Sequence, residues 1–251
     1  MSETPDAAAN PSPPQPLFYK TPEALTAESH GDLRLKSGAD FRFAKGACAV
    51  PITDVEFAAA SRWYPIVFAT DPVMPLAVTG LQHENLSIDT DGQWVAEHYI
   101  PAYVRRYPFV FIEHAGGLAL GLDRSCDRII TSDTNASAEP FFVGGQPSAF
   151  TKDAMNFSGQ LQAQQRTTAT FGAALAEQDI LVERQANTVL ADGRRYNLQG
   201  FKIVDAQKFH ELPDAVVLDW HKRGWLGLVQ LHFASLDRFR DLAQRMPKEV
   251  V

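Results

Sequence analysis

Apolar and polar positions follow the same order twice in the first half of the chain. Residues 57–81 read FAAASRWYPIVFATDPVMPLAVTGL, and residues 99–123 read YIPAYVRRYPFVFIEHAGGLALGLD. Each stretch predicts a short helix that ends at a Tyr-Pro pair and is followed by two apolar strands, because the residue before proline is driven out of the helical region. Five identities keep a constant separation of 43 residues: Arg62, Tyr64, Pro65, Val67 and Phe68 match Arg105, Tyr107, Pro108, Val110 and Phe111. The sequence therefore predicts two repeated helix–hairpin units, at about residues 55–81 and 99–123.

The segment before the first unit predicts short strands and a helix cap. Residues Leu33–Phe43 alternate apolar and basic side chains on both sides of a Ser-Gly pair. This pattern predicts a hairpin, or two short strands, with an exposed basic face. Thr53 or Asp54 is expected to cap the helix Val55–Arg62, since both side chains accept hydrogen bonds from free helical N–H groups.

The second half of the chain is mainly helical in pattern. Apolar residues recur at helical spacing from Ser148 to Glu177, with a glutamine-rich polar face, and predict one long helix or two in line that break at Gly159. Short strands are expected between residues 180 and 205. Further helices are expected at Ala206–Glu211, from Pro213 onward, and at Trp225–Leu242.

These elements predict an α+β fold. We expect a mostly antiparallel sheet built from the two helix–hairpin units, with the helical C-terminal part, about residues 148–245, packed on one face. Residues 1–16 are rich in proline and alanine and are expected to form a disordered tail. Residues 17–245 are expected to form a single domain.

Composition narrows the functional class. The net charge of −7 argues against a nucleic-acid-binding protein, which needs a basic face to neutralise phosphates. No apolar run approaches the roughly 18–20 residues that span a bilayer, and the N-terminus lacks the pattern of a secretory signal. We therefore expect a cytoplasmic protein without a membrane span, in which Cys48 and Cys126 are reduced thiols.

Three pairs place a carboxylate beside an imidazole: His83-Glu84, Glu97-His98 and Glu113-His114. Neighbouring residues on a strand point to opposite faces, so the members of a pair cannot chelate one ion together. Surface residues at turns explain the pairs, and neither a metal nor a cofactor is expected. The alternative is a metal-assisted enzyme of an unrecognised class that uses some of these six residues.

The clusters Arg105-Arg106-Tyr107 and Arg62-Trp63-Tyr64 are the candidate binding residues, because each lies where a helix meets a strand. An arginine beside aromatic rings can bind an anion there. It can equally satisfy the last carbonyls of the helix and stack on a ring, as a purely structural feature. In the structural case, replacing Arg105 or Arg62 with alanine is expected to cost a similar free energy of unfolding.

Several segments together resemble the bacterial SapC family: VPITDVEFAAASRWYPIVFA, PLAVTGL, ENLSIDTDGQW, YIPAYVRRYPFVF, GFKIVD and LPDAVVLDWHKRGWLGLVQLH. The resemblance covers about residues 17–240, and it brings no catalytic or binding residues with it. Members are often labelled peptide-transport permeases, a role that a chain without a membrane span does not fit. The family name is also linked to surface layers. The resemblance further implies a setting beside outer-membrane TonB-dependent receptors, halogenase-like proteins and cupin-like oxygenases.

No pattern in the chain assembles a nucleophile, a base and an oxyanion group. The sequence therefore favours a soluble, non-catalytic accessory or binding protein with an unknown small-molecule or protein partner. The resemblance implies a part in taking up or processing an extracellular nutrient, with a peptide- or glycan-derived molecule as substrate if the protein is an enzyme.

Overall fold

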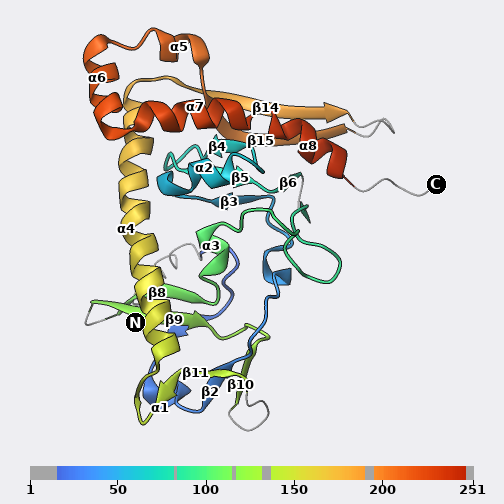
Figure 1. Ribbon diagram of the computed structural model, residues 1–251, viewed down its shortest axis with the longest axis vertical. Coiled ribbons are helices and arrows are strands. Elements are labelled where there is room, and N and C mark those ends of the chain that lie inside the picture. Colours follow the sequence, from blue (N-terminus) through green and yellow to red (C-terminus); the bar gives the residue numbers. More distant parts are fainter. Residues whose placement is uncertain (1–15, 82–83, 115–116, 132–136, 190–194, 247–251) are drawn as a thin grey trace, which may run out of the picture.

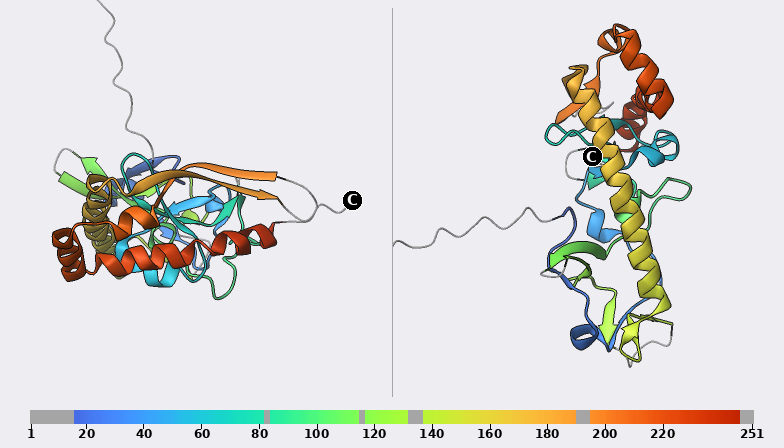
Figure 2. Two further views of the ribbon diagram at one scale, coloured as in Figure 1. Left: turned by 90° about the horizontal axis from the view of Figure 1, so that it is seen from above. Right: turned by 90° about the vertical axis from the view of Figure 1, so that its left-hand side faces the viewer.

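A 29-residue helix, α4 (Ala149–Glu177), runs along one side of the molecule and contacts elements near both of its ends (Figure 1). The structure is a computed structural model and describes residues 16–81, 84–114, 117–131, 137–189 and 195–246. The right-hand view of Figure 2 shows α4 in profile, reaching from the small lower strands to the C-terminal helices. Ser148 caps the helix by accepting a hydrogen bond from the Thr151 amide at 3.1 Å.

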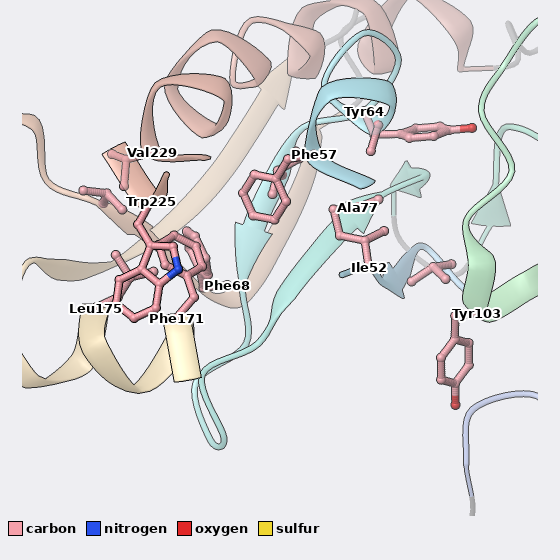
Figure 3. Close-up of a cluster of buried hydrophobic side chains, with 14 of the residues drawn as sticks. Ile52, Phe57, Tyr64, Phe68, Ala77, Tyr103, Phe171, Leu175, Trp225 and Val229 are labelled. Carbon is pink, nitrogen blue, oxygen red and sulfur yellow. The ribbon is translucent and has the colours of Figure 1, made fainter. Parts of the chain in front are cut away.

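A five-stranded antiparallel sheet lies beside the C-terminal end of α4. Its strand order is β14 (Leu181–Val189), β15 (Arg195–Val204), β4 (Ile66–Phe68), β5 (Pro75–Val78) and β3 (Ala49–Pro51). The 3-10 helix η2 (Asp54–Glu56), α2 (Phe57–Ala60) and α7 (Trp225–Ser235) pack beside this sheet. Side chains from the sheet, α2, α4 and α7 form the largest buried cluster, which includes Phe57, Phe68, Phe171, Trp225 and Val229 (Figure 3).

Two three-stranded sheets lie lower along α4. One has the order β1 (Pro22–Ala24), β9 (Gly117–Asp123), β8 (Phe109–His114), and the other has the order β10 (Ile129–Thr131), β2 (Leu33–Leu35), β11 (Glu139–Pro140). Their apolar side chains share a second buried cluster. Two-stranded pairs join β6 (Gly80–Leu81) to β7 (Glu84–Asn85), and β12 (Phe142–Val143) to β13 (Gln146–Pro147).

The remaining helices are short. They are α1 (Ala27–His30), the 3-10 helix η1 (Arg42–Ala44), α3 (Ala102–Arg105), α5 (Ala206–His210), α6 (Asp214–Arg223) and α8 (Arg238–Arg245). Asp205 caps α5, and Gly224 ends α6 with a φ of 75°, a left-handed conformation that glycine adopts at little cost.

The predicted α+β class and its antiparallel pairing are confirmed, and each predicted unit contains a short helix followed by a hairpin. Thr53 forms the capping box of the first unit with Glu56. The two hairpins, however, enter different sheets: β4–β5 joins the five-stranded sheet and β8–β9 pairs with β1. The expectation of one sheet fed by both hairpins was therefore wrong, because strands from distant segments pair with each hairpin separately.

Neither the hairpin nor the two short strands predicted for Leu33–Phe43 were correct. Only Leu33–Leu35 forms a strand, and it pairs with β10 and β11, which lie about a hundred residues later. The Phe41 and Phe43 side chains instead pack against other aromatic rings, including Trp94 and Tyr107. Alternation predicted the strand correctly but carried no information about its partner.

In the C-terminal half, α4 continues through Gly159 without a break. The predicted helix Trp225–Leu242 is divided into α7 and α8, and the short strands expected between residues 180 and 205 form one long hairpin, β14–β15. The predicted disordered tail falls, apart from residue 16, outside the described residues. Cys48 and Cys126, both described, are free thiols.

His232 on α7 links that helix to the five-stranded sheet. Its Nδ1 donates to the Ile66 carbonyl at 2.7 Å, and its Nε2 accepts from the Val204 amide at 3.1 Å. The ring is fully buried, and burial lowers its pKa from 6.5 to about 4 because the imidazolium form loses its hydration. The folded protein therefore holds this histidine neutral at pH values where an unfolded chain protonates it.

Stability is expected to fall as the pH drops from about 6.5 to about 4, because there the unfolded chain binds a proton that the folded chain does not. This one group should contribute a loss of roughly 3 kcal/mol across the window. Urea unfolding between pH 7 and 4 measures it. His232→Gln should flatten this part of the profile, whereas replacing the exposed His221 should leave it unchanged. Equal pH dependence in His232→Gln and wild type would refute the assignment.

Candidate functional site

The corner between α3 and β8 carries three of the predicted binding residues, and the structure gives each a different environment. Arg105 is exposed; its Nε donates to the Ile100 carbonyl at 3.1 Å, and its guanidinium lies 5.3 Å from the Phe157 ring centre. Arg106 is half-buried and lies over the Tyr103 ring at 4.2 Å. Tyr107 is buried, with its ring exposed by only 7%.

The corresponding residues of the first unit are placed differently. Tyr64 is fully buried, donates to the Tyr99 carbonyl at 2.7 Å and accepts from the Trp94 indole at 3.1 Å. Burial raises the pKa of Tyr64 to about 12, so the hydroxyl stays a hydrogen-bond donor. Arg62 is exposed, and it has no hydrogen bond, ion pair or ring contact within the described residues. Tyr64 therefore reaches the second unit through Tyr99, but within the described residues neither Arg62 nor Tyr64 has a hydrogen bond or ring contact with Arg105, Arg106 or Tyr107.

Arg105→Ala is expected to lower the free energy of unfolding by about 1 kcal/mol, because it removes the bond to Ile100 and the contacts with the Phe157 and Tyr99 rings. Arg62→Ala is expected to change it by less than about 0.5 kcal/mol, as for other exposed residues without contacts. Because the surroundings of the two arginines differ, we no longer expect the two substitutions to cost the same free energy of unfolding. Urea unfolding of both variants checks this, and a cost at Arg62 matching that at Arg105 would contradict it.

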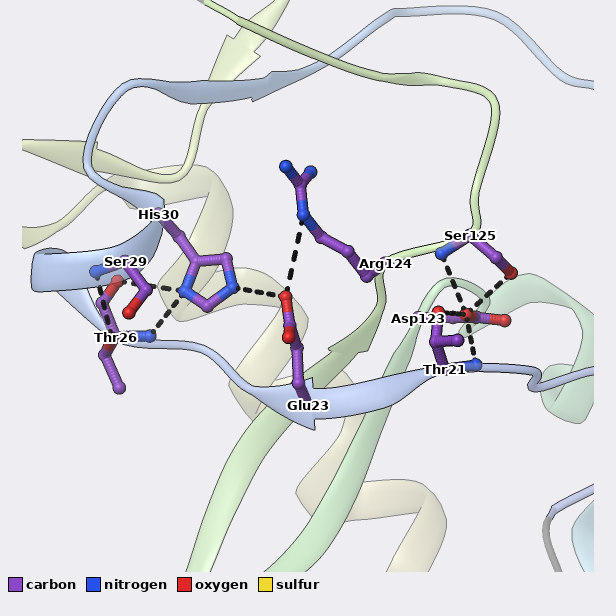
Figure 4. Close-up of polar contacts among 8 residues, drawn as sticks. All are labelled: Thr21, Glu23, Thr26, Ser29, His30, Asp123, Arg124 and Ser125. Carbon is purple, nitrogen blue, oxygen red and sulfur yellow. Dashed lines mark hydrogen bonds and ion pairs between the residues drawn. The ribbon is translucent and has the colours of Figure 1, made fainter.

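The Tyr107 hydroxyl is hydrogen-bonded to the buried carboxylate of Asp123. It donates to Oδ2 at 3.3 Å, and the Lys20 amide donates to the same carboxylate at 2.9 Å. The Thr21 amide and the Ser125 hydroxyl also donate to it, at 3.0 and 2.8 Å (Figure 4). Burial alone would raise the pKa of Asp123, but these hydrogen bonds outweigh it and lower the pKa. The carboxylate therefore holds the segment before β1, the end of β9 and Tyr107 in one arrangement.

A second polar group stands beside it in the same view. The buried His30 donates from Nε2 to the Glu23 carboxylate at 2.9 Å, and its Nδ1 accepts from the Thr26 amide at 3.1 Å (Figure 4). Arg124 lies 3.6 Å from the same Glu23 oxygen. Every nitrogen of the imidazole has a protein partner, so this group secures α1 against β1 and offers no free ligand atom.

Tyr107 forms part of the wall of a cleft, which we call the corner cleft. It has two adjoining lobes of about 200 and 170 Å³ that share Asp40, Phe43, Tyr107 and Arg128. The Phe43 and Tyr107 rings stack with their centres 3.9 Å apart and their planes inclined by 18°. This stacked pair gives the cleft an aromatic wall that is common to both lobes.

The rim of the corner cleft is mainly basic. Four basic side chains line it, Lys20, Arg42, Arg105 and Arg128, against two acidic ones, Asp40 and Asp127. Arg42 pairs with Asp40 at 3.4 Å, whereas the Arg128 guanidinium donates to the Gly38 carbonyl at 2.6 Å. In a chain of net charge −7, such a local excess of positive charge concentrates field lines in the cleft and attracts anions.

The carboxylate–imidazole pairs do not form a site among the described residues. His98 stacks on Trp63 with ring centres 4.6 Å apart, and burial together with the nearby Arg245 lowers its pKa. Within the described part of the chain, no group of three or more histidine, cysteine or acidic side chains could hold a metal ion. His83 and the side chains of Glu113 and His114 lie outside it, so the metal-assisted enzyme stays an untested alternative.

Of the residues that line the corner cleft, Arg105 and Tyr107 were among the predicted binding residues, and those contributed by other segments were not. Arg42 and Phe43 belong to the basic alternating segment Leu33–Phe43, whose exposed basic face was a usable signal. Arg128 stands in a polar connection between β9 and β10 with no pattern of its own. Only the tertiary fold brings these residues to one cleft.

The fold and the corner cleft together define an α+β protein with a cleft that has a mainly basic rim and an aromatic wall. The chain belongs to the SapC family, whose family model matches residues 25–242. No curated protein and no solved structure matched the chain. Of the helices in the described ranges, none combines the length and apolar character needed to cross a membrane.

Proposed function

We propose that this protein is a non-catalytic binding protein whose corner cleft holds a small organic anion. The observation that carries the proposal is the combination of a basic rim with the stacked rings of Phe43 and Tyr107. An arginine binds a carboxylate through paired N–H donors, and an aromatic wall favours a ligand with a flat apolar body. An aromatic carboxylate has both features.

Benzoate is a suitable first probe, and benzamide is its neutral counterpart of the same shape. A ligand that binds only the folded state raises the midpoint of thermal unfolding, and the rise grows with the ligand concentration relative to Kd. We expect benzoate to raise the midpoint and benzamide to leave it unchanged. The benzoate effect should weaken as salt is added, because ions screen the exposed rim charges.

Arg128→Ala should abolish the response to benzoate. The matched control is Arg166→Ala, which removes the same charge from an exposed position of α4 outside the cleft and should respond as the wild type does. An equal response to benzamide, or an unchanged response in Arg128→Ala, would exclude the cleft as the binding site.

We further propose that the protein acts in the cytoplasm and that it serves an outer-membrane uptake system as an accessory protein. The proposal of a link to TonB-dependent receptors and halogenase-like proteins is supported by family membership alone. Fractionation of the native host followed by detection of the protein would test the location. Co-purification with a receptor from the same cells would test the link.

A further inference from the structure

A second hollow lies on the other side of Arg105, between α3 and the middle of α4. It has a volume of about 250 Å³, and we call it the α4 groove. Its lining comes from three segments: Val55 and Glu56, Tyr99 to Arg105, and α4, which adds Phe157, Gln160, Leu161 and Gln164. Of the described residues, Arg105 alone lines both the α4 groove and the lobes of the corner cleft.

Glu56, the acidic residue of the α4 groove, is already fully satisfied. Its Oε1 accepts from the Tyr99 hydroxyl at 2.9 Å and the Ala102 amide at 2.7 Å. Its Oε2 accepts from the amide and the hydroxyl of Thr53 at 2.7 and 2.9 Å. Since the side chain is only 4% exposed, it offers a ligand neither a free oxygen nor an accessible charge.

Three polar side chains of the groove do retain unused hydrogen-bonding capacity. Within the described residues, no carboxylate lies within ion-pair distance of Arg105, and the side-chain amides of Gln160 and Gln164 have no hydrogen-bond partner. A glutamine amide presents two donors and one acceptor oxygen, which match the C=O and N–H groups of a peptide bond. The groove thus combines one available positive charge with two amides and the apolar surface of Val55 and Phe157.

We propose that the α4 groove binds the C-terminal end of a short peptide, with the terminal carboxylate on Arg105 and a peptide group on Gln160 and Gln164. A volume below the ~300 Å³ typical of sites for drug-sized molecules limits the occupant to a few residues. A sugar fits less well, because the guanidinium of Arg105 already lies over the Tyr99 and Phe157 rings, where a sugar would stack.

Calorimetric titration with trialanine and with its C-terminal amide tests the proposal. Trialanine should bind, and the amide should bind at least about tenfold more weakly, because it lacks the charge that pairs with Arg105. The double variant Gln160→Leu, Gln164→Leu should weaken trialanine binding by a similar factor. Gln165→Leu, on the same helix but outside the groove, should bind as the wild type does.

Two variants distinguish binding in the α4 groove from binding in the corner cleft. Arg128→Ala should leave trialanine binding intact, and the glutamine double variant should leave the response to benzoate intact. Absence of trialanine binding at millimolar concentration, equal binding of the amide, or full binding by the double variant would overturn the proposal. Binding of maltotriose in place of trialanine, lost in the double variant, would overturn it in favour of a sugar site.

Discussion

Replacement of Gly172 by alanine is expected to lower the free energy of unfolding by about 3 kcal/mol or more. Gly172 is buried on α4, where it faces the connection between β4 and β5. A methyl group at this position would lie 2.0 Å from the Val73 carbonyl oxygen and 3.0 Å from its carbon. Because both are backbone atoms, no side chain can rotate to relieve the overlap, and α4 would have to move away from the five-stranded sheet.

Gly159 on the same helix provides the matched control. A methyl group there would meet only Phe111, at 3.9 Å, which is ordinary contact. Gly159→Ala should therefore raise stability by about 0.5–1 kcal/mol, because alanine is the better residue inside a helix. Urea unfolding of both variants gives the comparison. If Gly172→Ala were as stable as Gly159→Ala, the close approach of α4 to the β4–β5 connection would be wrong.

Glu56→Ala is expected to cost about 3–5 kcal/mol, because four donors, three of them buried, would lose their acceptor together. Two of those donors come from Thr53 in the first unit, and the others come from Tyr99 and Ala102 in the second. The carboxylate thus links the two predicted units through hydrogen bonds, and its loss should loosen the α3 corner as well as η2.

Glu56→Gln separates the charge from the hydrogen bonds. It keeps one acceptor oxygen but turns an NH₂ group toward the remaining donors, so an intermediate cost is expected. Glu177→Ala, an exposed change at the end of α4, should be close to neutral. In chemical unfolding, the loss of stability should be largest for Glu56→Ala, intermediate for Glu56→Gln and smallest for Glu177→Ala. A Glu56→Ala protein as stable as Glu177→Ala would contradict the hydrogen-bonding scheme.

Local features of the fold could be read from the sequence because their causes are local. The capping box at Thr53, the end of α2 ahead of Pro65 and the long helix beginning after Ser148 each depend on residues a few positions apart. The hairpins of the two units also formed as expected, since each places two apolar strands a few residues apart.

Strand pairing over long distances could not be read in the same way. β2 pairs with β10 and β11, which lie about a hundred residues later in the chain, and apolar alternation is compatible with any partner. The different surroundings of Arg62 and Arg105 could not be predicted for a related reason. The Phe157 ring that Arg105 contacts lies on α4, outside both units, so the repeat carries no information about it.

The candidate site was predicted only in part. Arg105 and Tyr107 stood out because a basic residue and an aromatic one meet where a helix ends, which is a local signal. The other half of the corner cleft comes from Phe43 and Arg128, which are more than eighty residues apart in the chain. Beside the cleft, the Asp123 carboxylate holds the residues before β1 against the end of β9, again through partners that are far apart in the sequence.

The most direct test of the corner cleft is the position of a bound anion in a crystal. A crystal soaked in 4-bromobenzoate, measured at the bromine absorption edge, locates the ligand without prior assumptions. We expect the bromine peak beside the stacked rings of Phe43 and Tyr107, with the carboxylate within hydrogen-bond distance of Arg128. A bromine peak at another place on the protein, with the corner cleft empty, would contradict the proposed function.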